Sequence, residues 1–201
     1  MKGRFLSRNR PCHLKSLIHA MTGNRKQAVQ FPEKEFVSGE QILCLGHHYI
    51  LIVEMMNQNC SITPHIAQQE IHITISSFLN AEERKRIIKN ALIEWYYTQA
   101  EHIINERVNY YSQLLDVSPN KIIIKEQKRR WGSCSMNGTL RFNWRAIMAP
   151  LSIIDYIVVH ELCHLKIKNH SSDFWNLVSS LIPDYKKLRF WLKNNMGFFK
   201  I

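Results

Sequence analysis

His160 and His164 stand four residues apart in the string His160-Glu161-Leu162-Cys163-His164. On a helix, this spacing puts both imidazoles on one face a turn apart, so both can reach a single metal ion. Glu161 projects beside them, where a carboxylate can take a proton from water. This is the HExxH arrangement of zinc sites. The spacing therefore predicts a metal centre with Glu161 as its general base.

A catalytic zinc site typically has three protein ligands and an open fourth position. The third predicted ligand is His170, which follows His164 after a polar stretch where the helix can end. We expect Asn169 to adopt the left-handed conformation that ends a helix, which would turn the chain back toward the metal. Asp173 is the runner-up, although a carboxylate in the first turn of the next helix is also favoured by the helix dipole. The predicted cofactor is one Zn²⁺ ion on His160, His164 and His170.

The elements that must position these residues are helices. Residues 153–168 are strongly apolar and predict the helix that carries the motif, and Ser152 followed by Asp155 resembles a capping box that would open it. A second helical stretch starts at residue 171 or 172, is interrupted at Pro183, and resumes to residue 195. The two helices together predict a metal site near their connection.

Strands are predicted upstream in 41–45 and 48–54, two β-rich runs that flank Gly46, and in 70–76, 121–126 and 139–144, where apolar and polar residues alternate. Asn137-Gly138 predicts a hairpin turn before the last strand. Residues 81–116 contain no Gly or Pro and repeat apolar residues at helical spacing, which predicts one long helix or two abutting helices. We therefore expect an α+β fold, with a small mixed or antiparallel sheet packed on the metal-binding helix, a long preceding helix and a C-terminal helical segment.

The net charge of +11 suggests nucleic acid or anionic lipid as a partner, if the charge lies on one surface. Seven basic residues fall within the first thirty, and the first acidic residue is Glu33, so this arm carries +7 and the rest of the chain +4. We expect residues 1–37 to form a basic, poorly ordered arm through which nucleic acid could bind. An acid-free, arginine-bearing N-terminus would also suit an organelle transit peptide. Residues 38–201 are expected to form a single catalytic domain.

Apolar runs and cysteines bear on where the protein acts. No run approaches the roughly 18 apolar residues of a membrane span, so we expect no membrane partner. The five cysteines are odd in number and irregularly spaced, which suits reduced thiols better than a secreted disulfide framework. Cys163 faces away from the two histidines of its helix and is expected in the core. We therefore expect a cytoplasmic protein.

Six stretches carry a family resemblance: Arg129 to Cys134, Gly138 to Asn143, Asp155-Tyr156 running into the HExxH string, Asn169-His170-Ser171, Phe174-Trp175, and Pro183-Asp184-Tyr185. Over residues 38–195 they look like the YgjP-like metallopeptidase family. The resemblance implies a zinc-dependent hydrolase of a minimal zincin fold, related to the SprT-like and Wss1-like metalloproteases. It also implies His160, His164 and His170 as zinc ligands and Glu161 as the catalytic base.

The expected reaction is hydrolysis of a peptide or protein substrate, in which Glu161 takes a proton from a zinc-activated water. Strand 139–144 is expected at the sheet edge beside the metal helix, where main-chain pairing could hold an extended substrate. Arg129 and Arg130 are candidate substrate-binding residues because guanidinium groups suit carboxylates and phosphates, and Asn143 is a third. The alternative for the pair is a solvated Arg129 and an Arg130 that packs the strand end against the metal helix.

Two other function classes stay open. The first is a metal-dependent nucleoside triphosphate (UTP) pyrophosphatase, because a member of the resembling family has been described as acting on uridine triphosphate. The absence of a phosphate-cradling Gly-rich loop from the sequence counts modestly against it. The second is a DNA-associated SprT-like protease or binding module, which the kinship and the basic arm suggest.

Overall fold

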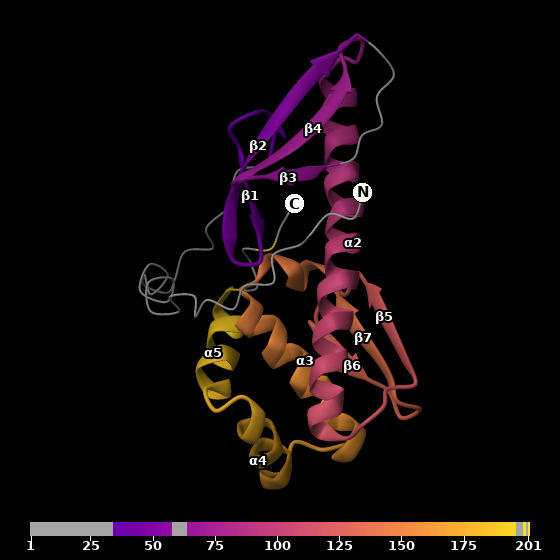
Figure 1. The fold of residues 1–201 in the computed structure, drawn as a ribbon, viewed down its shortest axis with the longest axis vertical. Helices are drawn as coiled ribbons and strands as arrows, with labels where there is room; N and C mark the ends of the chain where they lie inside the picture. The colour runs from indigo at the N-terminus through magenta and orange to yellow at the C-terminus, as the bar shows by residue number, and fades with distance from the viewer. Residues whose placement is uncertain (1–33, 58–63, 196–198, 200) are drawn as a thin grey trace. The chain divides into compact units, whose positions relative to one another are not determined.

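The computed structural model of the chain describes residues 34–57, 64–195, 199 and 201 (Figure 1). In it, the segment between the two groups of strands forms one continuous helix, α2 (Ala81–Leu115). A capping box opens the helix, since the Asn80 side chain accepts a hydrogen bond from the Glu83 amide and the Glu83 carboxylate accepts one from the Asn80 amide, both at 3.0 Å. The helix ends at Asp116, which is left-handed with φ 49°. The prediction of one long helix is confirmed.

The first sheet has four strands in the order β1-β2-β4-β3, with bounds β1 (Gln41–Cys44), β2 (His47–Met56), β3 (His65–Ala67) and β4 (Glu70–Ser76). β2 and β4 run parallel, and the other two pairs are antiparallel. The inner residues of β4 (Ile71, Ile73 and Ile75) are fully buried and share one core with the buried face of α2. The Tyr96 hydroxyl of α2 donates a hydrogen bond of 2.7 Å to the Leu43 carbonyl of β1. The N-terminal half of α2 is therefore fixed to this sheet.

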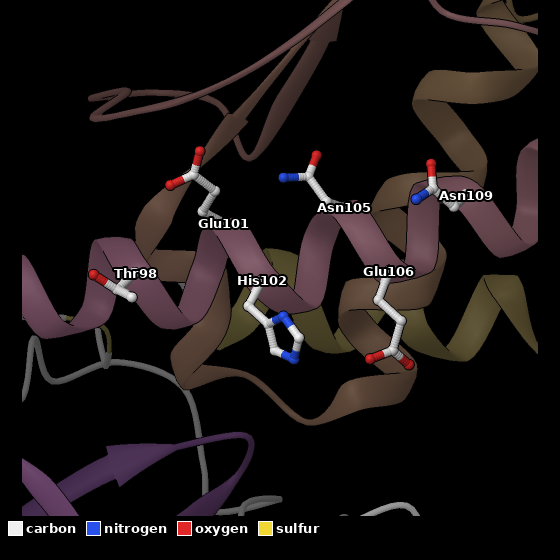
Figure 2. A pocket seen from close by; sticks show the side chains of 6 residues that line it. All are labelled: Thr98, Glu101, His102, Asn105, Glu106 and Asn109. Carbon is white, nitrogen blue, oxygen red and sulfur yellow. The ribbon is translucent and has the colours of Figure 1, made fainter. Parts of the chain in front are cut away.

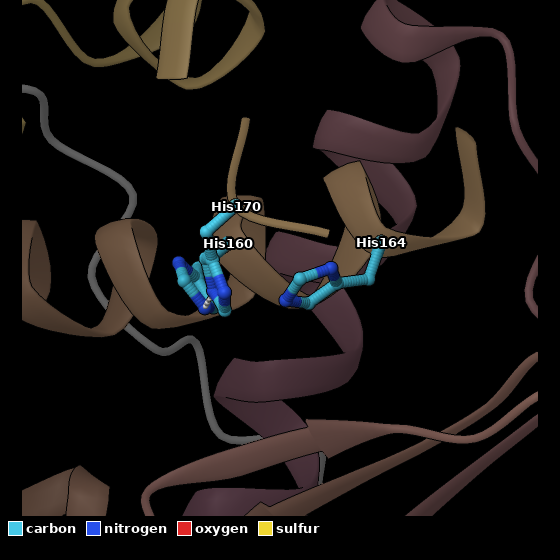
Figure 3. Close-up of side chains that lie close together, drawn as sticks. All are labelled: His160, His164 and His170. Carbon is cyan, nitrogen blue, oxygen red and sulfur yellow. Dashed lines mark hydrogen bonds between the residues drawn. The ribbon is translucent and has the colours of Figure 1, made fainter. Parts of the chain in front are cut away.

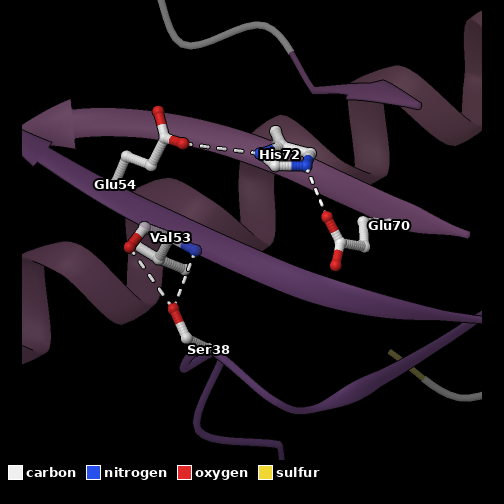
Figure 4. Close-up of polar contacts among 5 residues, drawn as sticks. All are labelled: Ser38, Val53, Glu54, Glu70 and His72. Carbon is white, nitrogen blue, oxygen red and sulfur yellow. Dashed lines mark hydrogen bonds and ion pairs between the residues drawn. The ribbon is translucent and has the colours of Figure 1, made fainter. Parts of the chain in front are cut away.

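The outer face of this sheet carries a small group of polar contacts (Figure 4). His72 lies between two carboxylates, with its Nε2 2.9 Å from Glu70 and its Nδ1 3.5 Å from Glu54. The Ser38 hydroxyl accepts a hydrogen bond from the Val53 amide at 2.8 Å and donates one to the Val53 carbonyl at 3.3 Å. These contacts tie the chain before β1 to the far part of β2.

The second sheet has three strands in the order β5-β7-β6, with bounds β5 (Lys121–Lys125), β6 (Gly132–Cys134) and β7 (Thr139–Asn143). The hairpin predicted at Asn137-Gly138 is confirmed, since it joins β6 to β7 and Gly138 has φ +76°. The prediction that strand 139–144 lies at the sheet edge is wrong. β7 pairs with β5 on one side and with the short strand β6 on the other, so β5 and β6 are the edge strands. Of these two, β6 packs beside α3.

Three helices complete the chain after the 3-10 turn η1 (Trp144–Met148): α3 (Leu151–Lys166), α4 (Ser172–Leu181) and α5 (Tyr185–Asn195). The capping box predicted at Ser152 is wrong. The cap residue of α3 is Pro150, and the buried Ser152 hydroxyl has no hydrogen-bond partner within the part of the chain that the structure describes. Asp155 instead binds Arg107 of α2 through two hydrogen bonds of 2.5 and 3.2 Å. A guanidinium is a stronger partner for a carboxylate than a backbone amide, and the pair holds α3 against the C-terminal half of α2.

The α+β fold class is confirmed, with two small sheets in place of one. Residues Lys34–Ile201 form one compact unit, and Phe36, at 2% exposure, belongs to its core. The predicted basic arm falls mainly on residues 1–33, which lie outside the described residues. Among the helices of the described part, none is long and apolar enough to cross a membrane.

Candidate metal centre

The structure brings His160, His164 and His170 together (Figure 3). One ring nitrogen from each lies within 4.8 Å of the others, and the Nε2 atoms of His160 and His170 are 3.0 Å apart. Zinc bonds of 2.0–2.1 Å in tetrahedral geometry require ligand nitrogens about 3.3 Å apart. The three imidazoles therefore have the spacing needed to hold one metal ion.

The chain reaches His170 by a different turn from the one predicted. The prediction that Asn169 is left-handed is wrong, because Asn169 is not among the described non-glycine residues with positive φ. Those residues are Phe36, Leu45, Gln68 and Asp116. α3 ends instead at Ile167, which is extended with φ −128° and still donates its amide hydrogen to the Cys163 carbonyl. The extended Ile167 redirects the chain before Asn169 is reached.

The carbonyl of Ile167 also orients a predicted ligand. It lies 3.1 Å from Nδ1 of His164. If Nδ1 carries the proton and donates it to this carbonyl, the Nε2 lone pair is left for a metal. The end of α3 thus fixes the ring of the ligand it carries.

An aromatic wall from α4 backs the three imidazoles. Phe174 is fully buried, and its ring centroid lies 5.0, 4.6 and 4.8 Å from the rings of His160, His164 and His170. The neighbouring Trp175 stacks on His170 at 5.5 Å with an interplanar angle of 25°. These contacts restrict the imidazole rotamers, so the arrangement of the three imidazoles is largely preformed.

The imidazoles of His160 and His170 are held in the neutral form that binds metals. Burial lowers the pKa of His160 from 6.5 to about 3, with smaller contributions from the neighbouring His164 and His170. Burial also lowers the pKa of His170, again assisted by His164. Both groups are therefore deprotonated at neutral pH, and metal binding there needs to displace no proton.

Glu161 is 6% exposed, and burial raises the pKa of its carboxyl from 4.5 to about 8, against an opposing contribution from the positive charge of Arg130. Gly132 of β6 lies directly against it, because a Cβ added at Gly132 would stand 2.7 Å from Glu161 Cγ and Oε1. Sequence reasoning missed this role of Gly132. The available signal was a glycine inside a strand, which often marks a close approach.

The three predicted substrate-binding residues have different places. Arg130 and Asn143 line a hollow beside the start of β6, whereas Arg129 is exposed and is absent from its lining. The Asn143 amide nitrogen donates to the carbonyls of Gln127 and Arg130 at 2.8 and 3.3 Å, and its oxygen accepts from the Arg145 amide at 3.1 Å. Asn143 thus braces the loop that carries Arg130.

Two other features lie apart from the histidine cluster. Asp173, the runner-up ligand, is exposed in the first turn of α4 and is not in the cluster. A shallow hollow of about 540 Å³ lies along α2, where Glu101 and Asn105 point away from His102 and Glu106 (Figure 2). All of its lining residues come from that single helix, so it is an open polar surface rather than a catalytic cleft.

The family model of the YgjP-like metallopeptidase domain matches residues 12–195. The chain belongs to the YgjP-like metallopeptidase family. The family resemblance read from the sequence is thereby confirmed, and membership supports a hydrolase that uses a metal. No curated protein matches the chain.

Two crystal structures of metallopeptidase zymogens are similar to this YgjP-like chain over part of its length. Abylysin from Pyrococcus abyssi is 24% identical with a TM-score of 0.41, covering 45% of this chain and 93% of that chain. Jannalysin from Methanocaldococcus jannaschii is 27% identical with a TM-score of 0.42, covering 46% of this chain and 96% of that chain.

Proposed function

We propose that this YgjP-like protein is a zinc-dependent peptidase in which His160, His164 and His170 hold one zinc ion and Glu161 is the general base. The observation that carries the proposal is the convergence of three imidazole nitrogens within 4.8 Å, next to a buried glutamate on the same helix. Three ligands leave the fourth position of a tetrahedral metal open, as catalytic zinc sites require. A family of metallopeptidases supplies the reaction class.

A zinc ion held by three neutral imidazoles supplies a Lewis acid that acidifies water and polarises a carbonyl. Glu161 follows His160 directly, so its carboxylate stands beside the ligands rather than among them. Its burial makes it a stronger base than an exposed glutamate. Glu161 takes a proton from the attacking water and passes it to the departing amine.

β6 is the strand we assign to substrate binding, in place of β7. The Trp131 carbonyl accepts a hydrogen bond from the Asn143 amide at 2.8 Å, and the Ser135 amide donates one to the Thr139 carbonyl at 3.0 Å. The main-chain groups of the odd-numbered residues along β6 therefore point toward β7. By the alternation of antiparallel ladders, the main-chain groups of Gly132 and Cys134 face the free edge. An extended peptide that pairs there would pass beside Glu161, because Gly132 touches it.

The test is hydrolysis of an unfolded protein by the zinc-loaded full-length chain. Glu161→Gln should lower kcat about 10²–10⁴-fold, since it removes the base while keeping the side-chain shape. Glu101→Gln is the matched control, because Glu101 is an exposed glutamate on α2; it should keep the wild-type rate. Full activity of Glu161→Gln would refute the assignment of the base.

The other function classes raised by the sequence gain no support from the comparisons. A nucleoside triphosphate arm in the same assay tests the pyrophosphatase alternative directly. DNA binding by the full chain at several salt concentrations tests the nucleic-acid alternative. Cytoplasmic location stays a prediction from the sequence.

A further inference from the structure

A small cavity of about 260 Å³ opens where β5 and β7 end. Its walls come from the loop after β5, from Trp131 just before β6, from Asn143 at the end of β7, from Arg145 two residues later, and from Phe199. Pockets for small-molecule ligands usually measure about 300–1,000 Å³. This cavity is therefore better matched to a single amino-acid side chain than to a cofactor.

The cavity lining is cationic. Lys128, Arg130 and Arg145 line it together with one carboxylate, Glu126, which lies 3.1 Å from Nη1 of Arg145. Glu126 therefore compensates Arg145, whereas Lys128 and Arg130 have no counter-charge within the lining. The cavity is left with two excess positive charges.

The cationic groups stand on a braced frame. The Arg145 guanidinium lies 4.2 Å above the ring of Trp144, which fixes its position. The loop carbonyl of Arg130 is tied to the buried Asn143 amide. The Arg130 backbone and the Arg145 guanidinium are therefore held in place, whereas the Lys128 and Arg130 side chains are exposed.

The apolar walls of the cavity are aromatic. Phe199 is 2% exposed and packs edge-to-face on Trp131 at 5.1 Å. Apolar walls beside cationic groups suit a side chain whose stem is aliphatic and whose end is a carboxylate.

The position of the cavity relates it to the catalytic base. Trp131 directly precedes Gly132, which lies against Glu161. Successive residues of an extended chain are about 3.3 Å apart. A peptide paired with the free edge of β6 would therefore place in this cavity a side chain within about two residues of the cleaved bond.

We propose that this cavity is a specificity pocket that takes an Asp or Glu side chain of the substrate, a proposal that rests on the peptidase function above. Arg130 and Lys128 attract the substrate carboxylate, and the same two charges repel a basic side chain. The protein is thereby selective for cleavage next to acidic residues.

The experiment maps the cleavage sites of the zinc-loaded protein in a mixture of peptides from digested proteins, by mass spectrometry. Wild type should enrich Asp and Glu about five- to tenfold at one position within two residues of the cleaved bond, corresponding to roughly 1.0–1.4 kcal/mol. The double variant Lys128→Glu/Arg130→Glu should exchange this preference for Lys and Arg. Arg130→Lys keeps the charge and should keep the acidic preference.

Lys125→Glu is the control for a single charge reversal, because it makes the same exchange as Lys128→Glu at an exposed residue of the β5 end that does not line the cavity; it should leave the cleavage profile unaltered. Thermal unfolding monitored by circular dichroism checks that each variant is folded. A second measurement needs no turnover: Glu161→Gln protein should bind a fluorescent peptide containing Glu about five- to tenfold more tightly than its Gln counterpart.

The outcomes separate the two proposals. If wild type cleaves peptides without acidic enrichment, or if the double variant keeps the wild-type profile, the pocket assignment is overturned and the peptidase function stands. If wild type cleaves no peptide at all, the proposed function fails, and the pocket assignment fails with it.

Discussion

The contact between Gly132 and Glu161 leads to the sharpest prediction about the catalytic base. In Gly132→Ala, the added Cβ would lie 2.7 Å from Glu161 Cγ and Oε1 and 2.9 Å from Cδ. Non-bonded carbon atoms prefer separations of about 3.5–4.0 Å, so the glutamate side chain must move by about 0.8 Å or more. Gly132 is not among the glycines with positive φ, so its backbone accepts alanine and the strain falls on this contact.

The predicted effect is larger on activity than on stability. A displacement of about 1 Å at a catalytic group can cost about 100-fold in rate, so kcat of Gly132→Ala should fall by this order. Overpacking of a buried contact costs about 1–3 kcal/mol of unfolding free energy. Zinc affinity should change by less than about threefold, because the three histidines are not displaced. Peptidase kinetics, urea unfolding and chelator competition measure the three quantities.

A double-mutant cycle supplies the control. In a Glu161→Ala background the obstructing side chain is gone, so adding Gly132→Ala should cost less than about 0.5 kcal/mol. Equal destabilisation in both backgrounds would show that the strain lies elsewhere. Retention of activity within threefold by Gly132→Ala would refute the argument that β6 positions the base.

Three further predictions follow from burial and backbone geometry. In metal-free protein, the Glu161 pKa of about 8 lies above its ordinary value of 4.5, so the folded chain keeps a proton that the unfolded chain loses between these values, and stability falls as pH rises through that window. Glu161→Gln should therefore gain about 1–3 kcal/mol of unfolding free energy over wild type between pH 5 and pH 8 in urea titrations, and a pH-independent difference would contradict this. Asp116→Gly should raise the unfolding free energy by about 0.5–1 kcal/mol, because residue 116 is left-handed at the end of α2 and glycine adopts that conformation without a Cβ penalty; an unchanged urea midpoint would count against it. Burial raises the pKa values of the Cys44 and Cys163 thiols to about 12, so iodoacetamide at pH 8 should modify both only after unfolding. Site-resolved mass spectrometry measures the labelling, and labelling of either thiol in native protein at the rate of an exposed thiol would contradict the assigned burial.

Much of the fold could be predicted from local patterns. The alternation in residues 70–76 matches β4, and the helical repeat in 81–116 matches α2 to within one residue. Long elements carry enough residues for their period to be read. Strands β3 and β6 have three residues each, which is too short for any alternation to show, and both were missed.

Strand order could not be predicted in the same way. Residues 139–144 alternate as a half-buried strand does, and nothing in that pattern says how many neighbours the strand has. The missed strand β6 pairs with one side of β7, so β7 is an inner strand and not the edge strand that the sequence predicts. Pairing across a sheet is set by contacts distant in sequence, so local alternation leaves it open.

Helix caps show how a local signal can be misread. Asn80 followed by Glu83 forms a true capping box, whereas Ser152 followed by Asp155 does not. Both strings have the same spacing, and the difference is tertiary: Asp155 is within reach of Arg107 from another helix. Such competition from a distant partner is invisible in a four-residue window.

The candidate site was predicted in its members but not in its support. The HExxH spacing and the nearby His170 were sufficient to name three histidines that lie together in the structure. The wall formed by Phe174 and the contact of Gly132 with Glu161 depend on how α4 and β6 pack on α3. Neither packing follows from spacing along the chain.

The most direct test of the central claim is the zinc stoichiometry and affinity of the purified full-length chain, measured by chelator competition. We expect one zinc ion per chain in wild type and in Glu161→Gln, whose three histidines are intact. His164→Ala should bind zinc more than about 100-fold more weakly, because it removes one of three ligands. Asp173→Ala should bind like wild type, since Asp173 lies outside the cluster. A wild-type chain that binds no zinc, or a His164→Ala chain that binds it with unchanged affinity, would contradict the account.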